Sequence, residues 1–194
     1  MLSLEKNKDL ILGYERIFAG VVATEVIEKP KPSIWMILIP IIFVFFFMRL
    51  NKVVKGRDEF ADNFMISRKR ALDEAYLVVK SGDPPDIDKL CNMSTVPQEI
   101  YPEYSGWLKL LVEHYGDLMR AQGESYEELI RATYLNRTNY LMSLNQLNAA
   151  EKRFDSALKP HIEEITPGVN EIVQSMEDCC ARLRKSHAEY VFPS

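Results

Sequence analysis

Apolar residues recur at helical spacing along most of the chain. Between residues 4 and 28 they return every three or four positions, as at Leu10, Tyr14 and Ile17, and this spacing predicts an amphipathic helix. Its charged residues make it a poor membrane span, so we expect it to lie on a membrane surface or to pack on a partner. The Lys-Pro-Lys-Pro sequence at 29–32 ends it, because a residue before proline avoids the helical conformation.

Two further segments follow at 50–80 and 83–102. Residues 50–80 can form one helix, and the Ser-Gly-Asp-Pro-Pro sequence at 81–85 ends it. Residues 83–102 contain four prolines, which predicts a long irregular connection with one short helical turn near Ile87.

The second half of the chain predicts three more helices. Residues 103–122 form the first of these. The second covers 126–158, with Ser125 as its N-cap and a glutamate three residues later, the spacing of a capping box. Pro160 is expected to close this helix, and Thr166 and Pro167 to begin the last one.

The last helix carries apolar residues at heptad spacing, which favours contact with another helix. We predict an interaction seam made of Val169, Ile172, Met176, Leu183 and Tyr190.

No segment has the pattern of a strand or a hairpin, and short connections favour antiparallel neighbours. The sequence therefore predicts an all-α fold, with a membrane-anchoring apolar helix and an antiparallel bundle of three to four helices. The expected parts are an N-terminal amphipathic helix at 1–29, an anchor at 33–54 and a soluble helical bundle at 55–194.

The anchor is predicted from residues 34–48, which contain no charged residue. With its flanks the segment reaches twenty-one residues at position 54, which is enough to cross a bilayer. Tryptophan suits the interface, and arginine or lysine can extend toward it. The residues assigned to the anchor are Trp35, Pro40, Phe43, Phe45, Phe46, Phe47, Arg49 and Lys52.

Two membrane arrangements fit this segment. Pro40 could kink one spanning helix, or it could mark the turn of a re-entrant helix–break–helix that enters and leaves on one face. Basic residues stand on both flanks, at 29–31 and 49–57, which suits the re-entrant form. If the segment spans, the larger basic excess after it puts the C-terminal domain in the cytoplasm, so the predicted location is a membrane with a single anchor.

Charge excludes one class of partner. Residues 1–57 carry nine Lys/Arg and five Asp/Glu, a net of +4, and residues 58–194 carry fifteen and twenty-three, a net of −8, which together give the −4 of the whole chain. An acidic domain is repelled by phosphate backbones, so we expect no nucleic-acid partner.

Catalytic and metal motifs are sparse. No phosphate-binding glycine loop and no zinc-protease motif occurs, and we expect no cofactor. The weak metal candidates are Asp86 and Asp88 in the proline-rich connection, and His161 beside two glutamates. Three cysteines are an odd number, and we expect free thiols rather than a disulfide framework.

Together these features favour a non-catalytic, membrane-anchored scaffold or accessory subunit. It would bind a protein partner, or a second copy of itself, through its helices at the membrane face. Two alternatives stay open: a re-entrant membrane enzyme that acts on a lipid-linked phosphate with a divalent metal, and a lipid-binding helical bundle.

Overall fold

The computed structural model describes residues 2–27, 56–163 and 169–193. These residues form helices and no strand, which confirms the all-α class. The helices are α1 (Leu2–Ile27), α2 (Gly56–Ser81), α3 (Ile87–Asn92), a 3-10 turn (Gln98–Ile100), α4 (Tyr101–Arg120), α5 (Tyr126–Tyr134), α6 (Arg137–Glu163) and α7 (Val169–Val191).

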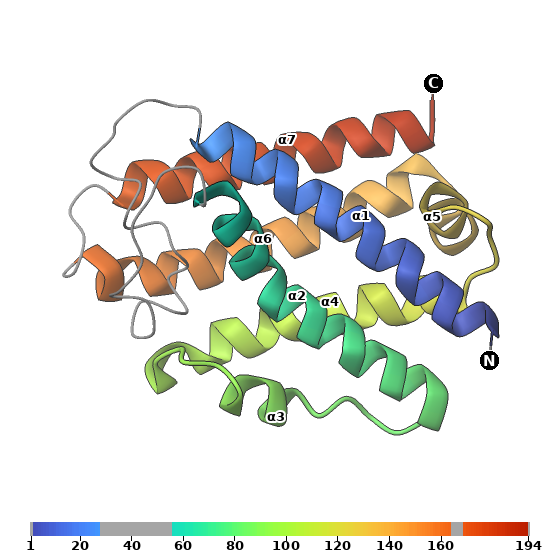
Figure 1. Cartoon of the computed structure of the whole chain (residues 1–194), viewed down its shortest axis with the longest axis horizontal. Coiled ribbons are helices and arrows are strands. Elements are labelled where there is room, and N and C mark those ends of the chain that lie inside the picture. Colours follow the sequence, from blue (N-terminus) through green and yellow to red (C-terminus); the bar gives the residue numbers. More distant parts are fainter. Residues whose placement is uncertain (1, 28–55, 164–168, 194) are drawn as a thin grey trace.

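The five long helices pack in a closed order. α1 packs on α2, α2 on α4, α4 on α6, α6 on α7, and α7 returns to α1. α6 and α7 run antiparallel, as do α1 and α2 (Figure 1). The predicted bundle is therefore present among the described residues from 56 on, where its long helices are α2, α4, α6 and α7, and α1 joins it as a fifth.

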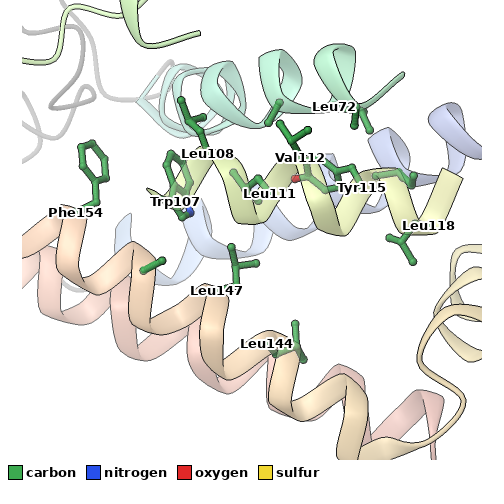
Figure 2. Close-up of a cluster of buried hydrophobic side chains, with 14 of the residues drawn as sticks. Leu72, Trp107, Leu108, Leu111, Val112, Tyr115, Leu118, Leu144, Leu147 and Phe154 are labelled. Atoms are coloured by element: carbon green, nitrogen blue, oxygen red, sulfur yellow. The ribbon is translucent and has the colours of Figure 1, made fainter. Parts of the chain in front are cut away.

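α4 lies at the centre of the main core. Leu108, Leu111 and Tyr115 have no exposed surface, and burying a large apolar side chain contributes roughly 1.5–3 kcal/mol. Figure 2 shows Leu108 of α4 pointing toward α2, while Leu144 and Leu147 of α6 point toward α4. α4 still keeps one polar stripe toward solvent, because Lys109, Glu113 and Asp117 are exposed.

α1 belongs to this bundle, although we expected it on a membrane or on another protein. Ile11 is buried in the main core, and Phe18 and Val22 are buried in a second cluster with Phe60 of α2. The segment is helical as predicted, but the stripe through Leu10, Tyr14 and Ile17 is not its buried side, because Ile17 is 70% exposed. The surface that covers the buried side comes from this chain itself.

The helix predicted at 126–158 is wrong, because it is two helices. Ser125 caps α5 as expected, with its Oγ accepting a hydrogen bond from the Glu128 N–H at 3.3 Å. α5 ends at Leu135, whose φ is 66°, and Asn136 then caps α6, since its Oδ1 accepts from the Asn139 N–H at 2.9 Å. Asparagine at this position offers the backbone an alternative to a continuous helix.

Two boundaries near α6 and α7 also need comment. Pro160 does not close its helix, because α6 continues to Glu163, and so few residues follow that the missing hydrogen bond has little helix to disrupt. The expected start of the last helix at Thr166 and Pro167 lies outside the described residues. The short turn near Ile87 is present as α3.

Candidate functional site

The predicted anchor at 33–54 lies wholly outside the described residues. It includes Trp35, Pro40, the phenylalanines, Arg49 and Lys52. Within the helices that the structure does describe, no segment combines the length and the apolar character needed to cross a bilayer.

The predicted seam on α7 faces α1. Ile172, Met176 and Leu183 are partly buried against the second cluster, which contains Phe18 and Val22 of α1. Among the other seam positions, Val169 begins α7, and Tyr190 is 70% exposed. The heptad pattern thus predicted a helix–helix contact, and the helix it meets is in the same chain.

The metal candidates are not brought together. Asp86 caps α3, with its Oδ1 accepting from the Lys89 N–H at 2.9 Å, whereas Asp88 is exposed and His161 lies exposed on α6. In the described part of the chain, no group of three or more His, Cys, Asp or Glu side chains could hold a metal ion.

The most unusual feature is a buried network of charges at the centre of the bundle. Arg68 of α2 donates to Glu15 of α1 at 3.1 Å and to Glu151 of α6 at 2.7 Å. Arg184 of α7 donates to the other oxygen of Glu151 at 2.6 Å and also to Asn148. Four helices each supply one charged side chain, and the two arginines balance the two glutamates. We call these four residues the ion network.

Aromatic rings surround the two guanidinium groups. The carbon Cζ of Arg68 lies 4.4 Å from the ring centre of Phe64, 5.6 Å from Phe18 and 5.8 Å from Trp107. Cζ of Arg184 lies 5.5 Å from the same Phe18 ring. Arginine suits such a place because its flat, weakly hydrated cation stacks on rings while it donates to carboxylates.

The pairing keeps Glu151 and the two arginines ionised. Burial alone would raise the pKa of Glu151, but Arg184 and Arg68 outweigh it and hold that pKa below its usual value. Burial alone would lower the pKa of Arg68, but Glu15 and Glu151 raise it. Opposite charges at contact distance favour the charged form of each partner.

The network leaves little room for a ligand. A cavity beside it has a volume of about 10 Å³ and is lined by Tyr14, Tyr126, Tyr140 and members of the network. This is about the space that one water needs.

A buried histidine, His114, and a half-buried one, His187, lie beside the network. His114 Nδ1 lies 2.6 Å from the Tyr134 hydroxyl, and His187 Nδ1 lies 3.0 Å from that of Tyr140. Burial, followed by the two buried arginines, lowers the pKa of His114 to about 3. Burial lowers the pKa of His187 to about 4. Both imidazoles are therefore neutral at neutral pH, and Nδ1 of each shares a hydrogen bond with a tyrosine hydroxyl.

A second polar feature is a pocket between α6 and α7, which we call the α6–α7 pocket. Its volume is about 120 Å³, and its lining includes four carboxyl groups, those of Glu151, Asp155, Glu177 and Asp178. The ion network forms its inner side through Glu151, so the pocket opens from the charged centre of the bundle toward the surface.

Sequence reasoning missed both features. Glu151 was visible as a charged residue in the apolar stripe of its helix, which is the one signal that could have pointed to a buried charge. Glu15, Arg68 and Arg184 stand among many other charged residues, and nothing local separates them from surface positions. No protein-family model, curated protein or solved structure matches this chain.

Proposed function

We propose that the protein is a membrane-associated helical scaffold without catalysis of its own, attached at the cytoplasmic face by residues 33–54. The observation that carries the proposal is the packing of the two helices that flank this segment. α1 precedes it, α2 follows it, and both belong to one packed bundle.

The flanking helices meet close to the segment. Val26, one residue before the end of α1, is buried in the same cluster as Phe60 near the start of α2. Further along, Glu15 of α1 and Arg68 of α2 form a buried ion pair. The end of α1 and the start of α2 therefore lie at the same end of the bundle, as Figure 1 shows.

This packing favours the re-entrant form of the anchor over a single span. A span would separate α1 from α2 by a hydrocarbon layer of about 30 Å, and it would leave the charges of Glu15 and Arg68 without each other. The six residues before Pro40, from 34 to 39, and the eight after it, from 41 to 48, would reach roughly 9 and 12 Å as helices. Both lengths fit within one leaflet.

Charge supports the cytoplasmic face. In the re-entrant form Lys29, Lys31, Arg49 and Lys52 come to the same side of the membrane, where anionic lipids of the cytoplasmic leaflet attract basic residues by about 1 kcal/mol each. The bundle itself is acidic, so these residues, rather than its surface, would provide the electrostatic attraction.

The partner would meet the exposed apolar residues of the bundle. The seam on α7 is covered by α1 except near its end, where Tyr190 is exposed. Leu135 and Met142 are large apolar residues that are also exposed. Such residues supply contact area for a protein partner or a second copy. The enzyme alternative is the weaker proposal, since Asp86, one of its two metal candidates, already serves as a helix cap.

Membrane topology is the first test. Small tags at residues 1 and 194 of the full chain would be tested for protease protection in sealed vesicles, together with sedimentation with the membrane fraction. We expect both tags on the cytoplasmic face and the protein in the membrane fraction. Tags on opposite faces, or a protein that remains in the supernatant, would contradict the proposal.

A variant separates the anchor from the bundle. Phe45→Ser with Phe46→Ser and Phe47→Ser should release the protein from membranes while its helical circular dichroism is unchanged. Leu77→Ser with Met93→Ser is the matched control, because both residues are half-exposed on the bundle, and it should stay membrane-bound. Release of the control as well would assign membrane binding to the bundle surface.

A further inference from the structure

Two carboxyl groups of the α6–α7 pocket, those of Asp155 and Asp178, have no ion pair among the described residues, and only Asp155 is buried. Glu151 is held by two arginines, and Glu177 lies 3.2 Å from Lys159 and 3.9 Å from Lys152. Asp155 is buried, with 8% of its surface exposed, and its Oδ2 has no hydrogen-bond donor.

The cations that act on Asp155 are already engaged elsewhere. Lys159 and Arg184 favour its ionised form, but they hold Glu177 and Glu151. Burial, followed by the charges of these two glutamates, raises the pKa of Asp155 well above its usual value. A buried carboxyl group without a donor is costly, and an incoming cation would relieve that cost.

The pocket suits an organic cation better than a metal ion. Across the described helices, no three ligating side chains come close enough for a metal, and burial raises the pKa of Cys180 in the pocket wall, so its thiol stays protonated. Met176 and Ala181 add an apolar side to the lining. A volume of about 120 Å³ exceeds the roughly 10–15 Å³ that one water needs, and it has room for a charged head and a short carbon stem.

We propose that the α6–α7 pocket binds an alkylammonium or guanidinium group, whose charge pairs with the carboxylate of Asp155 while its carbon stem lies along Met176 and Ala181. Two sources carry this chemistry: a free amine, and a lysine or arginine side chain of another protein. The lining of the site comes from α6 and α7, so its test does not depend on the proposed anchor.

The test uses n-butylammonium and n-butylguanidinium as probes and n-butanol as the uncharged control, at about 0.15 M salt to screen the general acidity of the bundle. Binding to the full chain would be measured by calorimetry. We expect both cations to bind at least about tenfold more tightly than n-butanol, a difference that ion pairing at a buried carboxylate supports.

Variants assign the binding to one residue. Asp155→Asn keeps the shape of the side chain and removes its ionisable group, so it should weaken the binding of both cations at least tenfold. Asp178→Asn is the matched control, because Asp178 lines the same pocket but is exposed and already accepts a hydrogen bond from Gln174, and it should change binding less than twofold. Equal binding to wild type and Asp155→Asn, or no binding of either cation to wild type, would overturn the proposal.

A measurement on the wild type keeps the test valid even if Asp155→Asn folds poorly. A cation that pairs with Asp155 must displace its proton, so calorimetry at pH 6 in buffers of different ionisation enthalpy should show proton release. Binding without proton release would contradict a role for this residue. Spermidine that binds at least tenfold more tightly than Nα-acetyl-lysine N-methylamide would identify a free amine as the source, and equal binding would identify a protein side chain.

Discussion

The ion network makes a sharp prediction for Arg68→Met. This change removes the cation that joins Glu15 to Glu151 and leaves Glu15 without its partner in the interior, since only 2% of the Arg68 side chain and 7% of that of Glu15 are exposed. Methionine fills much of the same volume, so the loss reflects charge rather than a cavity.

The magnitude follows from the burial of the pair. Removing one partner of a buried ion pair costs about 3–5 kcal/mol, because an uncompensated charge remains inside. A domain of this size loses about 2–4 °C of melting temperature per kcal/mol, so we expect Tm to fall by about 6–20 °C. The free energy of unfolding of a whole domain is about 5–15 kcal/mol, so the expected loss of about 3–5 kcal/mol is a large fraction of it.

The assay is urea and thermal unfolding followed by circular dichroism. Arg182→Met is the matched control, because Arg182 also pairs with a glutamate, Glu25, but its side chain is 55% exposed, and exposed pairs contribute about 0–1 kcal/mol. Arg68→Lys should cost less than Arg68→Met, because it keeps the charge but loses the planar fork that reaches two carboxylates.

A double change tests the reasoning about unpaired charge. Adding Glu15→Gln to Arg68→Met removes the orphaned carboxylate, so the double variant should be more stable than the sum of the two single losses implies. A loss below about 1 kcal/mol for Arg68→Met, or strict additivity in the double variant, would refute the idea that the pair is desolvated and coupled.

Three further predictions concern pH and the backbone. Burial lowers the pKa of His114 to about 3, so this residue favours unfolding as pH falls below its unfolded value of about 6.5. His114→Phe should therefore reduce the pH dependence of the unfolding free energy by about 1.4 kcal/mol per unit between pH 6 and 4, and an unchanged slope in urea unfolding would contradict this. Leu135 has a φ of 66°, so Leu135→Gly should raise stability by about 0.5–1 kcal/mol in urea unfolding, and a loss would show that this backbone is unstrained. A Cβ on Gly123 would lie 3.0 Å from a backbone nitrogen, so Gly123→Ala should lower Tm. A Cβ on Gly116 would meet only side chains, so Gly116→Ala should raise the free energy of unfolding by about 1 kcal/mol and raise Tm with it. The reverse order of the two Tm values would contradict the geometry.

The local features of the fold could be predicted from the sequence. The helices at 4–28 and 103–122, the cap at Ser125 and the short turn near Ile87 each depend on residues a few positions apart, whose spacing and hydrogen-bonding groups are visible in the chain. Errors came where two local signals compete: the apolar stripe continued past Leu135, while Asn136 offered a cap that ended one helix and began another.

By itself, then, the sequence determined the all-α class, most helix positions and the apolar segment at 34–48. Only the tertiary structure decided that α1 covers the seam on α7, and that charges at positions 15, 68, 151 and 184 meet in the interior. Periodicity tells which face of a helix is apolar but not which helix covers it. The four charges of the ion network are neutralised by partners from distant parts of the chain, and that pairing exists only once the helices have packed.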